Sequence, residues 1–360
     1  MRVPLNDLGR AYERDRPALD AAVADVLTSG WYVHGRQHAA FEEELAAFVG
    51  VDHCVGVASG TDALELALRA VALEGRTHVV TAANAGGYTS VAALRAGLVP
   101  RYADVDVATH CLRAADVEAV LDDDVAAVVV THLYGRLADV GPLVELAATA
   151  GIPVVEDCAQ AIGASRAGVA AGAFATVGTF SFYPTKNLGA LGDGGALATH
   201  DGEVAERLRL LRQYGWEAKY RIGLPGGRNS RLDELQAAIL RVRLPGVLAA
   251  NERRRAIIAR YRSAASGSIA VLPAEGADHS GHLAVAVAGD RDGARAALDS
   301  AGVATDVHYP VPDHRQPGLP GGDVSLPVTE RLAGQVLTLP CFPELTDQEV
   351  DAVCEALAAL

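Results

Sequence analysis

The chain is almost free of lysine. Its 360 residues include only Lys186 and Lys219, against 29 arginines. Arginine supplies surface charge and anion contacts as well as lysine does, but it cannot lose its proton near neutral pH and attack a carbonyl group. A lysine retained in the glycine-rich segment 179–195 is therefore a candidate Schiff-base nucleophile. The alternative, a surface lysine that arginine has not yet replaced, fits Lys219 better.

Other features are also missing, and each absence excludes a class of protein. No apolar run approaches the roughly 20 residues that cross a bilayer, and the N-terminus has no apolar signal core. The five cysteines are widely spaced, and no CxxC or HExxH motif is present. We therefore expect a cytoplasmic protein with reduced thiols, no membrane partner and no metal site. A net charge of −14 provides no basic footprint for a nucleic-acid partner.

From about residue 51 to 210, apolar strand-like runs alternate with alanine- and leucine-rich helical segments. The runs cover residues 77–82, 98–103, 126–131, 152–156, 175–183 and 195–199. This alternation predicts an α/β fold with a mostly parallel central sheet that helices cover on both faces. A dinucleotide-binding oxidoreductase would need a Gly-x-Gly-x-x-Gly turn after its first strand, and none follows residues 54–58.

The C-terminal part of the chain reads as a second, smaller unit. A helix over 232–243, closed by Pro245, is expected to lead out of the first unit. A long helix, a strand and a terminal helix are predicted over 252–265, 283–287 and 347–359. We therefore expect a large α/β domain over 1–248 and a smaller α+β domain over 249–360.

An acidic residue at a strand end supports the nucleophilic interpretation of Lys186. Segment 152–160 reads as a buried parallel strand that ends in polar residues. The ligand crevice of an open α/β sheet lies beyond the carboxyl ends of its strands, where Asp157 and Gln160 stand. Pyridoxal phosphate needs a lysine for its aldehyde and a carboxylate against its pyridinium nitrogen, which Asp157 offers. The commoner role of an aspartate is helix capping, and Glu156 should point to the opposite face.

A strand-to-helix turn offers a phosphate site. The strand-like run that begins at residue 55 passes through Ser59-Gly60-Thr61 into a helix, whose free N–H groups and dipole attract anions. Gly60 lets the backbone approach closely, and Thr61 and Ser181 add hydroxyl groups. On its own, such a turn is most often plain helix capping.

Six segments in order resemble the DegT/DnrJ/EryC1/StrS group of sugar aminotransferases, which are fold-type I pyridoxal-phosphate enzymes. The segments are Ser29-Gly-Trp-Tyr-Val-His-Gly35, Ser59-Gly-Thr-Asp-Ala-Leu64, His132-Leu-Tyr-Gly-Arg-Leu-Ala-Asp139, Glu156-Asp-Cys-Ala-Gln160, Ser181-Phe-Tyr-Pro-Thr-Lys-Asn187 and the stretch 227–238. Each is only moderately specific, but six in order over the whole chain identify it as a member of the family.

The resemblance implies a cofactor role for each matching residue. Lys186 would form the Schiff base with pyridoxal 5′-phosphate and move the proton of the donor. Asp157 would pair with the ring nitrogen, and Gln160 would lie close to the ring hydroxyl. The phosphate contacts would be Gly60, Thr61 and Ser181, together with Asn229 of a neighbouring subunit. The active sites would therefore be shared across a homodimer.

The resemblance also implies a reaction and a substrate class. The amino group would pass from L-glutamate or L-glutamine to a nucleoside-diphosphate-linked deoxy-keto-hexose. Amination at C3 is favoured because Tyr183 stands where C4 enzymes more often have histidine. The alternatives are a C4 keto-sugar or keto-cyclitol substrate. A sugar dehydratase would have histidine in place of Lys186, and a non-catalytic regulator would not retain Lys186, Asp157 and Ser181 together.

Candidate contacts to substrate come from four parts of the chain. They are Trp31, Tyr32, Tyr183, Arg231, His308 and Tyr309. Because cofactor and substrate are both anionic, a few local arginines must offset the negative net charge. Arg221, Arg228 and Arg231 are the candidates, whereas segment 253–255 reads as a solvated helix face.

One segment departs from the family pattern. The aromatic residue that stacks on the cofactor ring would align with Gly86 in Ala83-Asn-Ala-Gly-Gly-Tyr88, and glycine has no side chain to stack. Tyr88 is the candidate replacement, and its alternative role is that of an ordinary loop aromatic. An aromatic contact of this kind contributes about 0.5–1.5 kcal/mol.

Overall fold

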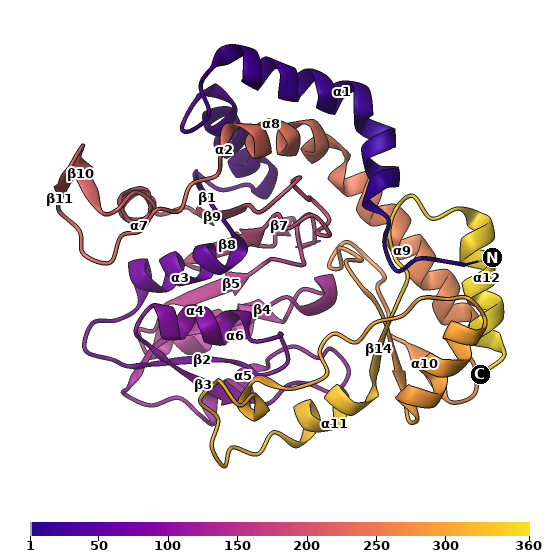
Figure 1. Ribbon diagram of the computed structural model, residues 1–360. Helices are drawn as coiled ribbons and strands as arrows, with labels where there is room; N and C mark the ends of the chain where they lie inside the picture. The colour runs from indigo at the N-terminus through magenta and orange to yellow at the C-terminus, as the bar shows by residue number, and fades with distance from the viewer. Residues whose placement is uncertain (1) are drawn as a thin grey trace.

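A seven-stranded sheet forms the centre of the computed structural model, which describes residues 2–360 (Figure 1). Its strands, in spatial order, are β1 (His53–Val57), β9 (Gly195–Thr199), β8 (Val177–Ser181), β5 (Val154–Asp157), β4 (Val125–Thr131), β2 (His78–Ala82) and β3 (Val99–Ala103). The pairs from β8 through β3 are parallel, and β9 runs antiparallel to both of its neighbours. This arrangement confirms the mostly parallel sheet expected from the strand-helix alternation.

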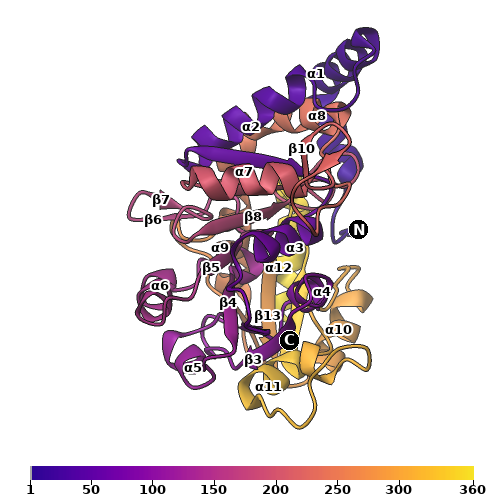
Figure 2. The same cartoon turned by 90° about the vertical axis from the view of Figure 1, so that its left-hand side faces the viewer.

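Helices cover both faces of the sheet (Figure 2). One face carries α3 (Gly60–Val71), α4 (Tyr88–Arg95) and α7 (Gly202–Leu211), and the other carries α2 (Arg36–Val49), α5 (Ala114–Glu118), α6 (Val140–Thr149) and α8 (Glu234–Arg243). Strand β4 shows why both faces are apolar. Ala127 and Val129 pack on the α3 side, whereas Val128 and Val130 pack on the α6 side, because successive side chains alternate.

Two helices join the sheet to the C-terminal part of the chain. Helix α1 (Leu8–Ser29) packs against α8, and α9 (Val247–Ala264) continues from α8 through the short 3₁₀ turn η2 (Leu244–Gly246). The helix predicted to start at 252 starts five residues earlier. Pro245 lies in the first turn of η2, where the missing N–H costs no hydrogen bond, so it does not separate the two helices widely.

The C-terminal part has its own small antiparallel sheet. Its strands are β12 (Ile269–Val271), β13 (Ala284–Ala288) and β14 (Val336–Leu339), and its helices are α10 (Arg291–Ser300), α11 (Pro327–Gln335) and α12 (Asp347–Ala358). The N-terminal Val3 pairs with Val303 and packs into the same apolar cluster. A domain boundary near 248 stays a prediction.

The remaining elements are short. They are η1 (Leu133–Gly135), β6 (Ser165–Arg166), β7 (Val169–Ala170), β10 (Trp216–Ala218), β11 (Arg221–Ile222) and η3 (Asp313–Arg315). The β10–β11 hairpin projects from the body at the left of Figure 1. Within residues 2–360, no helix combines the length and apolar character needed to cross a membrane.

Candidate active site

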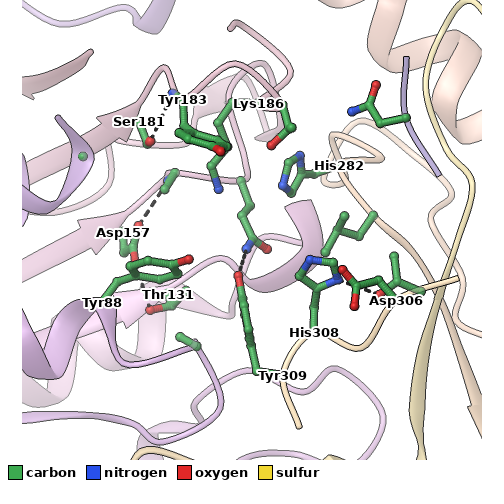
Figure 3. A pocket seen from close by; sticks show the side chains of 18 of the residues that line it. Tyr88, Thr131, Asp157, Ser181, Tyr183, Lys186, His282, Asp306, His308 and Tyr309 are labelled. Carbon is green, nitrogen blue, oxygen red and sulfur yellow. Dashed lines mark hydrogen bonds between the residues drawn. The ribbon is translucent and has the colours of Figure 1, made fainter. Parts of the chain in front are cut away.

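A cavity of about 620 Å³ opens at the carboxyl ends of β4 and β5. Its walls come from the sheet edge, the start of α3, the loop after β8 and the C-terminal part of the chain (Figure 3). Seven residues expected at the cofactor lie here: Gly60, Thr61, Tyr88, Asp157, Gln160, Ser181 and Lys186. Residues almost 130 positions apart in sequence are therefore brought to one site.

Lys186 stands in the turn that follows β8. Its backbone N–H donates to the carbonyl of Tyr183 at 2.8 Å, which closes the turn. Gly189 is needed in the same turn, because a Cβ atom there would lie 2.4 Å from the carbonyl oxygen of Pro184. Desolvation lowers the pKa of Lys186 from 10.5 to about 8, and the charge of Asp157 partly opposes that shift.

Asp157 ends β5 and is only 5% exposed. Its carboxylate accepts a hydrogen bond from the backbone N–H of Ala159 at 3.1 Å and a longer one from the Thr131 hydroxyl at 3.4 Å. Burial raises the pKa of Asp157, whereas the Ala159 N–H and the charge of Lys186 lower it. Within residues 2–360 no cationic side chain forms an ion pair with this carboxylate. Asp157 can therefore accept a cationic ring nitrogen.

Glu156 points to the opposite face of β5, as the strand alternation predicts. Its carboxylate accepts the backbone N–H groups of Gly172, Phe174 and Ala175 at 2.8–3.0 Å. His132 Nε2 lies 2.9 Å from the same carboxylate, while His132 Nδ1 accepts from the N–H of Ala138. The proton of His132 is thus on Nε2. Although Cys158 also lies nearby, these bonds occupy the ligand atoms that a metal ion would need.

The phosphate cradle is formed by the start of α3 and the end of β8. The side chain of Ser59 caps α3 by accepting from the N–H of Asp62. Glycine is needed at position 60, because a Cβ atom there would lie 2.5 Å from the Cβ of Ser181. The first-turn N–H groups of a helix lack partners within the helix, so they can bind the phosphate oxygens.

Gln160 is held on two sides. Its Oε1 accepts the backbone N–H of Tyr134 at 2.5 Å, and its Nε2 donates to the hydroxyl of Tyr309 at 3.2 Å. Tyr309 belongs to the Pro-rich segment after residue 306, so this bond connects the C-terminal part of the chain to the sheet edge. Burial raises the pKa of Tyr309 well above its ordinary value.

Tyr309 also fills the space left by the missing side chain at position 86. A Cβ atom on Gly86 would lie 2.8 Å from Cε1 of Tyr309. Tyr88 meets Tyr309 edge to face, with the ring centroids 6.2 Å apart, and both rings line the cavity (Figure 3). The departure from the family pattern at Gly86 is therefore accompanied by a pair of tyrosines beside Asp157.

The residues expected to contact substrate divide into two groups. Tyr183, His308 and Tyr309 line the cavity. Trp31, Tyr32 and Arg231, together with the phosphate candidate Asn229, lie outside the cavity of their own chain, and Trp31 is 63% exposed.

The expectation that residues 253–255 form a solvated helix face is wrong for Arg254. Of Arg221, Arg228 and Arg231, none lines the cavity of this chain, and Arg228 pairs with Asp62 at 3.2 Å. The arginine that lines it is Arg254, which is 6% exposed rather than on a solvated helix face. Helical spacing could have revealed this, because residues 251, 254, 258 and 261 form the buried stripe of α9.

His282 is a further cavity residue that sequence reasoning missed, and Asn187 is its hydrogen-bond partner. The Nδ2 of Asn187 donates to Asn251 Oδ1 at 2.7 Å and to the carbonyl of Ser280 at 3.0 Å. Its Oδ1 therefore accepts from His282 Nδ1 at 2.9 Å. Burial lowers the pKa of His282 well below 6.5, and the charges of Lys186 and Arg254 add to this effect. His282 is neutral beside Lys186.

A model of the DegT/DnrJ/EryC1/StrS aminotransferase family matches residues 14–358, almost the entire chain. The chain belongs to this family. Membership confirms both the fold class and the aminotransferase activity that the six segments imply, so the DegT/DnrJ/EryC1/StrS assignment applies to the whole molecule.

Individual members of the DegT/DnrJ/EryC1/StrS family are similar over their full length. EryC1 of Saccharopolyspora erythraea, named as an erythromycin biosynthesis sensory transduction protein, is 43% identical, with both chains covered completely. The dTDP-3-amino-3,4,6-trideoxy-alpha-D-glucose transaminase of Streptomyces venezuelae is also 43% identical, over 99% of this chain and 95% of its own. The crystal structure of S. venezuelae DesV with a ketimine intermediate aligns with a TM-score of 0.96 at 42% identity, over 99% of this chain and 98% of DesV.

Proposed function

We propose that this aminotransferase is pyridoxal-phosphate-dependent and transfers an amino group to the C3 keto group of a nucleoside-diphosphate-linked deoxy-hexose. The observation that carries the proposal is the convergence of Lys186, Asp157 and the Gly60–Ser181 cradle on one cavity. The transaminase from S. venezuelae supports the sugar class and the carbon, because its name specifies a dTDP-linked 3-amino sugar.

The residues of the cavity fit this cofactor. Asp157 has the unpaired carboxylate for the ring nitrogen, the start of α3 has the donors for the phosphate, and Lys186 has an amine of lowered pKa for the aldehyde. When bound, pyridoxal phosphate supplies an electron sink that stabilises negative charge on the donor Cα.

Lys186 serves as the proton carrier. A pKa of about 8 leaves a substantial part of the amine neutral at pH 7–8, so Lys186 can accept a proton and return it. His282 does not compete for that proton, because its surroundings keep it neutral. Asp157 would hold the ring nitrogen of the cofactor, and its hydrogen bond from the N–H of Ala159 fixes the direction of the carboxylate.

The segment around His308 forms part of the cavity wall. His308 Nδ1 lies 2.9 Å from the hydroxyl of Thr338, and the His308 carbonyl accepts from the hydroxyl of Tyr134 at 2.7 Å. These bonds hold His308 in place, and His308 and Tyr309 line the cavity together with Lys186. We assign them, with the 53%-exposed Tyr183, to contacts with the sugar.

The donor and the assembly are further parts of the proposal. L-glutamate is the expected donor and L-glutamine the alternative. The protein is expected to be a homodimer in which Asn229 of the partner subunit reaches the phosphate. Asn229, Trp31 and Tyr32 are exposed on their own chain, which supports a role for them at the site of the partner subunit. The cytoplasmic location stays a prediction.

The name of EryC1 raises a regulatory role as the alternative. Such a role would require neither a desolvated lysine nor a buried carboxylate that faces it, and the structure has both. A catalytic function is therefore favoured.

The proposal is tested by the absorbance spectrum of the cofactor-loaded protein before and after addition of L-glutamate. The band of the lysine-bound cofactor should convert to that of pyridoxamine phosphate, and Lys186→Ala should show neither the band nor the conversion. The same protein should then transfer the amine to a dTDP-linked 3-keto-6-deoxyhexose. A band unchanged by both glutamate and glutamine would exclude the proposed donors, and a failure to bind the cofactor would exclude the proposed chemistry.

A further inference from the structure

Arg254 is a buried cation without an acidic partner. It lies on α9 with 6% of its surface exposed. One guanidinium nitrogen, Nη1, donates to the carbonyl of Cys341 at 2.6 Å, whereas Nε is buried and has no hydrogen-bond partner. Within residues 2–360, no carboxylate lies within ion-pair distance of Arg254. Burying a charge without a partner is costly, so an arginine retained here indicates an anion that binds to it.

Arg254 lies in the same compartment as the nucleophile. Both Arg254 and Lys186 line the main cavity, and both also line a smaller cavity of about 60 Å³ next to it. His282 lies close enough to each of them that both positive charges depress its pKa. The cation and the amine therefore face the same small volume, one from α9 and the other from the loop after β8.

The other charges around this volume do not satisfy Arg254. The acidic residues of the main cavity are Asp157, Asp193 and Asp306. Asp157 faces the cofactor position, and neither Asp193 nor Asp306 pairs with the guanidinium. The charge of Glu344, which lines the smaller cavity, acts to raise the pKa of Arg254, but its carboxylate is already bound by Arg14.

Resting on the proposed function, we propose that Arg254 binds the carboxylate of the amino-acid donor. Every such donor carries a carboxylate beside the amine that reacts at the cofactor. The planar guanidinium matches a carboxylate with two parallel hydrogen bonds, and Arg254 is the single arginine that lines the cavity in the described part of the chain. It thus selects amines that bear a carboxylate at the donor stage and fixes their orientation toward Lys186.

The test compares two aminooxy probes that differ in the carboxylate. Aminooxyacetate carries one, whereas O-methylhydroxylamine does not, and both react with the lysine-bound cofactor with loss of its absorbance band. In wild-type protein the second-order rate should favour aminooxyacetate. In Arg254→Gln this preference should fall at least tenfold, because a charge-assisted hydrogen bond to the carboxylate is lost, while the rate with O-methylhydroxylamine stays the same.

The adjacent Arg255 provides the matched control. It lies on the same helix and donates to a backbone carbonyl, that of His279 at 3.1 Å, but it does not line the cavity. Arg255→Gln should keep the wild-type preference. As a second readout, calorimetric binding of glutarate, a dicarboxylate without an amine, should weaken at least tenfold in Arg254→Gln and less in Arg254→Lys, which keeps the charge.

Each outcome has a distinct meaning. A cofactor-loaded Arg254→Gln protein with the wild-type probe preference and wild-type glutarate affinity would overturn the carboxylate site and leave the proposed function intact. A wild-type protein without the lysine-bound cofactor band would contradict the proposed function itself. If Arg254→Gln does not fold, the probe preference of Arg254→Lys tests the proposal instead. Its point charge should retain only part of the preference for aminooxyacetate, and an unchanged preference would overturn the carboxylate site.

Discussion

The burial that makes Lys186 reactive also lowers the stability of the folded protein. In the folded protein its pKa is about 8, and in the unfolded chain it returns to about 10.5. Between these values the unfolded state binds more protons, so the free energy of unfolding rises with pH from about 8 to 10.5. Below pH 8 the folded protein holds a buried, poorly solvated charge. The cost is up to about 3 kcal/mol, by the conversion of 1.36 kcal/mol per unit of pKa.

Removing that charge should stabilise the cofactor-free protein. We expect Lys186→Met to increase the free energy of unfolding at pH 7 by up to about 3 kcal/mol, with the gain disappearing above pH 10. Urea denaturation at pH 7 and pH 10.5 measures it. Lys219→Met, on the exposed β10–β11 hairpin, is the control and should change little. Equal stabilities of Lys186→Met and wild type at pH 7 would mean that the amine is well solvated when folded.

Residue chemistry predicts some functional positions and hides others. Lys186 and Asp157 could be found because few other residue types perform their chemistry. Glu156 could not be interpreted, because its partners at 172–175 are brought beside it only by the loop that follows β7. The burial of Arg254 is hidden for a related reason, since three consecutive arginines suggest a solvated face unless their helical positions are counted.

The loop before α4 joins the sheet to the C-terminal segment. Gly87 is the N-cap of α4, and its N–H donates to the buried carboxylate of Asp313 at 2.8 Å. Asp313 also accepts from the hydroxyl of Ser90 at 2.6 Å, and its own N–H donates to the carbonyl of Ala83. Burial raises the pKa of Asp313 to about 6. Gly86, which meets the Tyr309 ring, and Gly87, which binds Asp313, therefore both contact the segment that carries Tyr309.

Gly86→Ala and Gly87→Ala separate backbone strain from contact with Tyr309. Both residues have left-handed φ values, +77° and +81°, so each substitution should cost about 1–2 kcal/mol of stability. Only the Cβ at 86 would collide with Tyr309, since the one at 87 would lie 3.6 Å from Leu319. We therefore expect the Kd for pyridoxal phosphate to rise about tenfold more in Gly86→Ala than in Gly87→Ala.

Fluorescence titration of the cofactor-free proteins measures this difference. In the double variant Gly86→Ala/Tyr309→Ala, the ring that the new Cβ would displace is already absent. The Kd of the double variant should therefore be close to that of Gly86→Ala alone. Equal affinities of the two single variants would show that Tyr309 has no part in covering the cofactor.

Elements were easier to predict than the contacts between them. The six strand-like runs coincide with six strands of the sheet to within a few residues, because fully buried strands are apolar on both faces. The sequence predicts too late a start for α9, because Pro245 resembles a helix stop although it lies in a first helical turn. The Tyr309–Gly86 contact joins positions 223 residues apart and had no sequence signal.

At the scale of the molecule, three expected site residues that lie outside the cavity indicate how two chains would assemble. Asn229, Trp31 and Tyr32 match the family pattern yet lie outside the cavity of their own chain. In a two-fold symmetric dimer each subunit presents the same surface to the other, so such residues can complete the partner's site. A second copy would also supply part of the positive charge that the acidic chain lacks around its anionic ligands.

A shared site makes a prediction that no monomeric enzyme can meet. Lys186→Ala and Asn229→Ala should each be weakly active at limiting cofactor. In a hybrid dimer, however, one site combines the intact lysine of one subunit with the intact asparagine of the other. Mixing equal amounts under conditions that exchange subunits should restore roughly a quarter of wild-type activity, because half of the dimers are hybrids with one intact site. Lys186→Ala mixed with Asp157→Ala should restore none, since both residues line the same cavity. Equal recovery in the two mixtures, or a single-subunit mass in sedimentation equilibrium, would contradict the shared site.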